Sequence, residues 1–255
     1  MKTRVLFFLT VLFFLTSCAE LVKVLQTTGN VPLTETEVVN GLREALGTGA
    51  VNAAGLLSKT DGYYGDDLVK ILLPDEARMI ADNISRIPGG DKLVEDVILR
   101  INRAAEDAAR EAAPIFVNSI RQMTIGDAFG ILNGTDDAAT NYLRRTTFNE
   151  LYALYKPKIQ ASTEKKIVGN ISTKESWNTL TSKWNSVANS VAGKLAGLNP
   201  VNTDLDDFLT GKALSGLFLK VETEELKIRK EINARVTPLL QKVFGSLDSK
   251  TSAYK

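Results

Sequence analysis

Apolar side chains recur at three- and four-residue steps between Asp91 and Ala112, and this spacing constrains the fold more than any other feature of the chain. The apolar positions are Val94, Val97, Ile98, Ile101, Ala104, Ala105, Ala108 and Ala112. Charged side chains fill the positions between them, so the pattern is typical of an amphipathic α-helix with one buried face. The alanines at the end of the stripe would allow a second helix to approach closely.

The same helical spacing continues along most of the chain, and we find no alternating strand pattern of useful length and no internal repeat. The sequence therefore predicts an all-α fold: an antiparallel bundle of about seven to ten helices without a sheet. The short connections favour antiparallel neighbours. We expect one helical domain over residues 34–248, followed by a disordered tail at 249–255.

Caps and turn residues predict where the helices begin and end. Thr34 and Glu37 have the spacing of a capping box, and Gly47 and Gly49 are expected to end that helix, with a second short helical segment at 51–57. Further starts are expected at Pro74, Asp91, Thr124, Asp136, Lys174, Asp204 and Pro238. Loops are expected at 58–73, 164–173 and 193–202, and the last helix is expected to end at Gly245.

The first eighteen residues have the three-part organisation of an export signal. Lys2 and Arg4 precede an apolar run at 5–15, and the small residues Thr16 and Ser17 precede Cys18. The run is far shorter than the ~20 residues that a helix needs to cross a bilayer. The segment Leu15-Thr16-Ser17-Cys18 has the form of a bacterial lipobox, and the alternative is an ordinary signal peptide with a cysteine near its cleavage site by chance.

Acylation of Cys18 would anchor the mature chain to a membrane after residues 1–17 are removed. Each buried lipid methylene contributes about 0.8 kcal/mol, and two lipid signals already give stable anchoring. Residues 18–33 would then form a flexible tether. Ala19, which is not Asp, favours the outer membrane by the bacterial sorting rule, with the protein facing the periplasm. Cys18 is the only cysteine, so its acylation would exclude disulfides and cysteine catalysis.

Charge and composition narrow the classes of function. Removal of residues 1–17 takes Lys2 and Arg4 from 31 basic side chains, which leaves 29 against 30 acidic side chains. This balance gives no electrostatic attraction to nucleic acid. The chain contains no histidine, which excludes a Ser-His-Asp triad and the common zinc sites. We expect no metal site and no cofactor.

Several short blocks together resemble one bacterial family. They are Gly41-Leu42-Arg43-Glu44-Ala45-Leu46, Asn102-Arg103-Ala104-Ala105-Glu106, Pro114-Ile115-Phe116, Asp136-Asp137-Ala138-Ala139-Thr140, Tyr142-Leu143-Arg144-Arg145-Thr146-Thr147 and Lys212-Ala213-Leu214-Ser215-Gly216-Leu217-Phe218. The chain resembles the domain of unknown function 4197 family over about residues 38–245. The resemblance implies an exported, often lipid-anchored helical protein of Gram-negative bacteria, and it supplies no activity and no site residue.

The densest polar group of the sequence is a candidate ligand site. It consists of Asp136, Asp137, Arg144, Arg145, Thr146 and Thr147. Asp137 and Arg144 are seven residues apart and so share a helix face, and arginines bind carboxylates or phosphates with two parallel hydrogen bonds. The structural interpretation is favoured: the aspartates stabilise a helix start and the arginines pair with carboxylates on neighbouring helices.

Three other patterns carry weaker functional interpretations. The acidic loop at 61–67 could bind a cation but lacks EF-hand spacing, and a turn explains it better. Ser162-x-x-Lys165 matches a motif of penicillin-recognising enzymes without its companion motifs, so we interpret it as a chance match. An aromatic set could line a ligand cavity, although core packing is its usual fate; it contains Tyr142, Tyr152, Tyr155, Trp177, Trp184, Phe208 and Phe218.

No catalytic constellation emerges, so the sequence favours a non-enzymatic binding or scaffold module of the bacterial envelope. Its expected partners are the membrane, through the lipid on Cys18, and an envelope protein or small ligand of unknown identity. Two alternatives remain at this point. One is a carrier of a small apolar ligand between the helices, and the other is a hydrolase or lyase that uses carboxylates with Arg144 or Arg145.

Overall fold

The computed structural model describes residues 33–83, 89–202 and 204–252, and the predicted signal, Cys18 and nearly all of the predicted tether lie outside these ranges. The described chain contains ten α-helices and no strand, which confirms the predicted all-α class. The helices are α3 (Glu35–Leu57), α4 (Arg78–Asp82), α5 (Gly90–Ala109), α6 (Ala112–Ile120), α7 (Ile125–Leu132), α8 (Ala138–Glu164), α9 (Thr173–Ala188), α10 (Val191–Leu195), α11 (Leu205–Lys230) and α12 (Pro238–Ser252).

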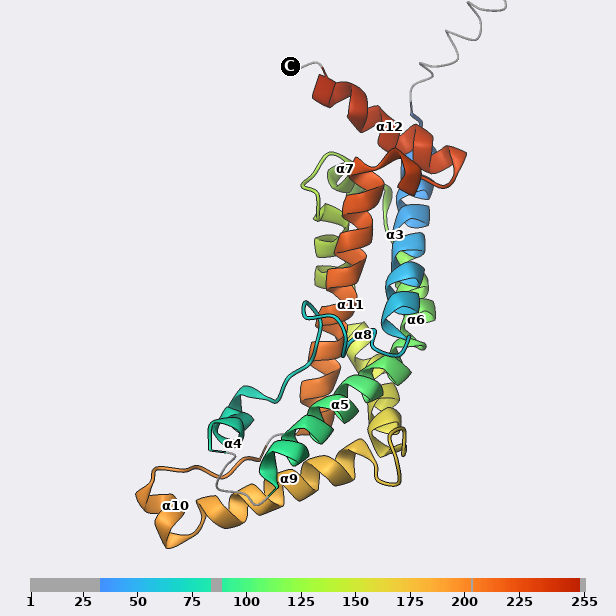
Figure 1. Cartoon of the computed structure of the whole chain (residues 1–255). Coiled ribbons are helices and arrows are strands. Elements are labelled where there is room, and N and C mark those ends of the chain that lie inside the picture. Colours follow the sequence, from blue (N-terminus) through green and yellow to red (C-terminus); the bar gives the residue numbers. More distant parts are fainter. Residues whose placement is uncertain (1–32, 84–88, 203, 253–255) are drawn as a thin grey trace, which may run out of the picture.

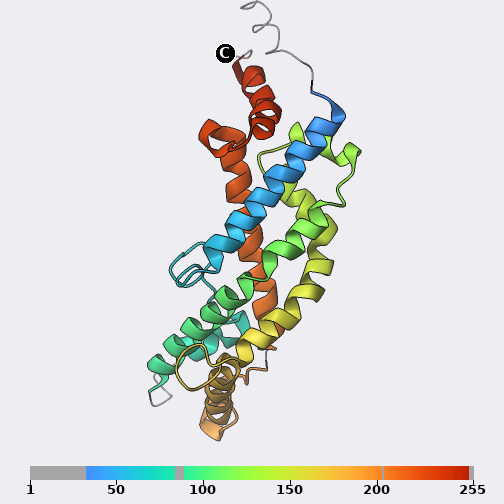
Figure 2. The ribbon, with the colours of Figure 1, turned by 90° about the vertical axis from the view of Figure 1, so that its right-hand side faces the viewer.

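Three long helices, α3, α8 and α11, form the axis of an elongated bundle (Figure 1). Helix α11 packs against both α3 and α8 and runs antiparallel to each of them. Helix α5 packs against α8 and α9. In both views α12 lies at one end of the bundle and α9 and α10 lie at the other (Figures 1 and 2).

The start of α3 lies at the α12 end of the bundle. The Glu37 carboxylate accepts a hydrogen bond from Lys242 of α12, and it also accepts one from the Thr34 N–H in the predicted capping box. Gly41 brings α3 close to α12, because a Cβ at this position would lie 2.6 Å from a methyl group of Val243. A chain that emerges from a tether before Leu33 would therefore enter the bundle at this end.

Most predicted helix starts are confirmed by their capping geometry. Thr124 caps α7 in a capping box with Asp127, and Ser172 caps α9 one residue before its first turn. Asp204 accepts hydrogen bonds from two backbone N–H groups at the start of α11. Such side chains satisfy donors that have no partner within the helix.

Three predicted boundaries are wrong, and tertiary packing explains the first. Helix α3 continues through Gly47 and Gly49 to Leu57, because Gly49 is buried against the Glu224 side chain of α11. Helix α10 occupies the first part of the loop expected at 193–202. Helix α12 extends beyond Gly245 to Ser252 and so includes residues 249–252 of the expected tail, whereas 253–255 lie outside the described residues.

The bundle interior is filled by aromatic and aliphatic side chains. Tyr155, Trp184 and Phe218 are fully buried, and the Phe218 ring contacts the rings of Phe116 and Phe148. Most members of the predicted aromatic set therefore pack into the core. This arrangement counts against a carrier whose ligand lies between the helices.

Candidate functional site

The structure places the predicted polar cluster around the first turns of α8, where each member is bound to a different neighbour. Asp136 forms an ion pair with Lys230 of α11. Asp137 accepts hydrogen bonds from the side chains of Thr135 and Asn141, and these bonds lower the pKa of its carboxyl. No ion pair in the described chain joins the two aspartates of the cluster to its two arginines.

The arginines and threonines of the cluster are also engaged elsewhere. The Arg144 guanidinium lies over the Phe218 ring, 5.0 Å from its centroid, and that of Arg145 lies over Tyr142. Thr146 and Thr147 donate their hydroxyl hydrogens to carbonyls one turn earlier in α8. The expected pairing of these arginines with carboxylates is not seen in the described part of the chain, and cation–π contacts take its place.

The carboxyl groups with shifted pKa values are all stabilised in the charged form. Every described carboxyl group whose pKa departs from its ordinary value has a lowered pKa, as hydrogen bonds from lysines, arginines or hydroxyl groups favour the charged form. In the described ranges, no group of three or more His, Cys, Asp or Glu residues could hold a metal ion.

The acidic loop at 61–67 is fixed as a turn by a buried carboxylate. Glu106 accepts hydrogen bonds of 3.1 Å from the N–H groups of both Tyr63 and Tyr64. Arg103 joins this carboxylate to the loop, because it donates to Glu106 and to Asp61. The structural interpretation of the loop therefore accounts for its polar residues.

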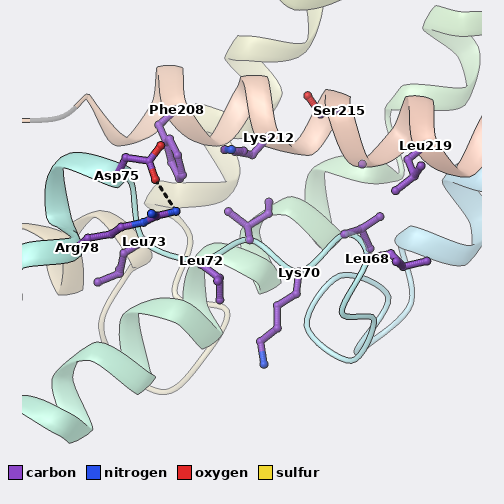
Figure 3. A pocket seen from close by; sticks show the side chains of 13 residues that line it. Leu68, Lys70, Leu72, Leu73, Asp75, Arg78, Phe208, Lys212, Ser215 and Leu219 are labelled. Carbon is purple, nitrogen blue, oxygen red and sulfur yellow. Dashed lines mark ion pairs between the residues drawn. The ribbon is translucent and has the colours of Figure 1, made fainter. Parts of the chain in front are cut away.

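A surface hollow next to this loop is the best candidate for a functional site. We call it the α11 groove: it lies between residues 68–73, named here the 68–73 segment, and the N-terminal half of α11, and its volume is about 330 Å³ (Figure 3). Phe208, Lys212, Ser215, Gly216 and Leu219 line it from α11, and Asp75 and Arg78 line its end.

Burial alternates along the 68–73 segment. Val69, Ile71 and Leu73 are buried, whereas Leu68 and Leu72 are 76% and 59% exposed. Leu68 and Val69 lie in a turn in which the N–H groups of Val69 and Lys70 bond to the Asp66 carbonyl. From Lys70 onward the alternation is typical of extended chain, in which successive side chains point to opposite sides. Two large apolar side chains are therefore held at the surface next to the groove.

Asn102 of α5 fixes the segment from the protein interior. Its side chain is fully buried and accepts a hydrogen bond of 2.9 Å from the Ile71 N–H. The same amide group donates to the Ile71 carbonyl at 2.7 Å and to the Ile98 carbonyl of its own helix at 2.7 Å. Both backbone groups of Ile71 are thus satisfied by one side chain, as a neighbouring strand would satisfy them.

Gly216 allows the chain before the segment to approach α11. A Cβ at this position would lie 2.8 Å from the Tyr63 ring and 3.4 Å from Val69. Tyr63 is buried, and its hydroxyl donates to the Ala213 carbonyl of α11 at 2.8 Å. The groove is therefore a preformed feature with a rigid wall.

The cationic side chains at the groove differ in their partners. Lys212 forms no ion pair with any described residue, and its Nζ atom lies 5.8 Å from the centroid of the Phe208 ring. Arg78 is paired with Asp75 at 2.9 Å, and these two lie beside Phe208 in Figure 3. Lys70 points away from α11 in this view, and its ammonium lies over the Tyr64 ring. The groove thus combines apolar side chains with two lysines that form no ion pair in the described chain, of which Lys212 comes from α11.

The sequence interpretation missed this site because it placed residues 58–73 in a loop. The available signal was the nearly continuous apolar run from Leu68 to Leu73. Such a run is unusual for a solvated loop. In a half-buried extended segment, alternate residues of the run can pack into the core while the others lie at the surface.

The fold and the groove define an all-α bundle protein with a preformed surface groove and no catalytic cluster in its described part. The sequence profile described as "Protein of unknown function (DUF4197)" matches residues 32–245, so the chain belongs to this family, as its sequence blocks predicted. No curated protein and no solved structure matches the chain. Within the described ranges, no helix has the length and apolar character needed to span a membrane.

Proposed function

We propose that this chain is a lipid-anchored protein of the bacterial cell envelope that binds another envelope protein through the α11 groove and is not an enzyme. The observation that carries the proposal is the pair of exposed leucines, Leu68 and Leu72, beside a groove whose wall is rigidly held. Exposed apolar side chains gathered at a preformed hollow are typical of binding surfaces.

The position of the groove supports this proposal. Its lining residues on α11, Phe208 to Leu219, belong to the N-terminal part of this helix, and that part lies away from the end of the bundle at which α3 begins (Figure 1). A lipid on Cys18 would therefore leave the groove open to a partner in the periplasm. The lowered carboxyl pKa values and the dispersed Arg144 and Arg145 give no support to a hydrolase or lyase.

Photo-crosslinking in living cells tests the groove. A photoreactive phenylalanine analogue replaces Ser215, which is exposed and lines the groove, and in a control it replaces Thr223, which is exposed on α11 outside it. We expect a discrete protein adduct from position 215 and none from position 223. The adduct from position 215 should be lost when the Lys212→Glu substitution is added. Identical adducts from both positions, or none from position 215, would contradict the proposed function.

Metabolic labelling tests the anchor. Cells that express the chain are grown with labelled palmitate, and a Cys18→Ser variant provides the control. We expect label in the wild-type protein, which should fractionate with outer membranes, and no label in the variant. Absence of label from the wild-type protein would remove the lipid anchor from the proposal.

A further inference from the structure

The 68–73 segment has one backbone edge satisfied by the protein and one edge open. Asn102 binds both backbone groups of Ile71 from the inner side. In extended chain the backbone groups of adjacent residues point to opposite edges, so those of Leu72 point the other way. The Lys70 N–H is already bonded to the Asp66 carbonyl in the preceding turn. Among the described residues, no hydrogen bond reaches the Leu72 N–H or the carbonyls of Lys70 and Leu72.

Lys70 and Leu72, which carry these open backbone groups, are among the residues that line the α11 groove. Residues of the 68–73 segment form one wall, and Phe208, Lys212 and Leu219 line the hollow from α11 (Figure 3). Open backbone groups of an extended segment beside a groove are groups with which an extended peptide can pair as a further strand. Main-chain hydrogen bonds to the edge would supply affinity, and the helix would select the side chains of the peptide.

The charges at the groove indicate which peptide fits. Lys212 has no carboxylate partner among the described residues, whereas Arg78 is already paired with Asp75 and Lys220 is paired with Asp66. One acidic side chain in an otherwise apolar peptide would complement this arrangement, because opposite charges across an interface fix register and partner choice.

From the open edge, the groove and the unpaired lysine, we infer that the α11 groove binds an extended peptide segment of a partner protein, which pairs as a β-strand with the backbone of Leu72 and places an acidic side chain at Lys212. This inference rests on the proposed function and adds the mode of recognition to it.

Fluorescence anisotropy with the full lipidated chain in detergent tests the inference. The probe is the labelled heptapeptide Thr-Val-Thr-Glu-Thr-Val-Thr, whose residues favour extended chain and whose central Glu supplies the acidic group. Two further probes carry a methyl group on one backbone nitrogen, either that of Glu or that of the following Thr. Because these nitrogens point to opposite edges of the peptide, we expect one methylation to weaken binding by roughly tenfold or more and the other to have little effect.

Charge exchange tests the role of the lysine. Lys212→Glu should weaken binding of the Glu probe and strengthen binding of a probe with Lys in its place. The matched control is Lys183→Glu on α9, where the side chain is exposed and does not line the groove; it should change neither affinity. Leu72→Pro, which removes the open N–H, should weaken both probes, and circular dichroism checks that this variant remains helical.

Three results would overturn the inference. The first is that the two methylated probes bind equally well. The second is that the Glu and Lys probes bind equally well to the wild-type chain. The third is that the Glu probe does not bind, whereas the fatty acid laurate binds saturably in the groove. If these occur while the Ser215 crosslink to a protein persists, the proposed function stands and strand pairing is wrong. If the crosslink is also absent, both fail.

Discussion

Asn102 holds one wall of the groove through hydrogen bonds to the backbone of Ile71, and its replacement by alanine tests this role. The buried amide group makes three hydrogen bonds, two to the backbone of Ile71 and one to the Ile98 carbonyl. Alanine can make none of them, so the backbone groups of Ile71 would lose their partners inside the protein.

The expected loss of stability follows from these contacts. Each hydrogen bond contributes about 1 kcal/mol net, and a buried group left without a partner costs about as much or more, so we expect Asn102→Ala to lower the free energy of unfolding by about 3 kcal/mol. With a urea m-value of about 3 kcal/mol/M, the midpoint of unfolding should fall by about 1 M.

Urea unfolding of the full chain in mild detergent, followed by circular dichroism, measures this change. The control is Asn149→Ala, at an exposed position of α8, which should shift stability by less than about 0.5 kcal/mol. Hydrogen exchange should also accelerate at the Ile71 N–H more than at the α8 core. A midpoint equal to that of the control, with unchanged exchange at Ile71, would refute the role assigned to Asn102.

Further predictions concern other buried or capping groups. The Tyr155 hydroxyl is buried without a hydrogen-bond partner in the described chain, so Tyr155→Phe should leave stability unchanged or raise it. Tyr63→Phe, in contrast, should lower stability by about 1 kcal/mol. Thermal unfolding compares the two variants, and an equal loss of stability in both would contradict this prediction. Gly216→Ala should lower stability by about 1–2 kcal/mol through its clash with the Tyr63 ring. Gly211→Ala on the same helix, with open space around it, should raise stability by about 0.5–1 kcal/mol. A gain in stability in both variants would show that the chain before the groove moves away from α11 at no cost. The hydrogen bond from the α12 lysine, with that from the Thr34 N–H, lowers the pKa of Glu37 from 4.5 to about 2, so its stabilisation is complete above pH 4.5 and is lost as pH falls toward 2. Hydrogen exchange in α12 should rise over this range, and Glu37→Gln should remove much of that pH dependence; an unchanged profile in the variant would refute the assignment.

The polar cluster at the start of α8 shows why the local sequence pattern was not enough to predict the partners of its side chains. The spacing predicts that Asp137 and Arg144 share a helix face, but α8 begins at Ala138 and Asp137 stands at its N-cap, outside the helix. The choice of partner was decided by other elements, because α11 supplies Lys230 to Asp136 and the Phe218 ring to Arg144. Sequence spacing within one helix contains no information on which neighbouring helix lies against it.

By itself the sequence determined the helical class, the capped starts of α3, α7 and α11 and the family, because periodicity and capping are local properties read from residues close together in the chain. Only the tertiary structure decided that α3 continues through its glycines, since the packing of Gly49 against α11 offsets a weak helix propensity. It also decided that residues 68–73 form the wall of a groove, because the hydrogen bonds that hold them come from Asn102, thirty-one residues away from Ile71. Local patterns fix which segments are helical, whereas contacts between distant residues fix which surfaces remain open to a partner.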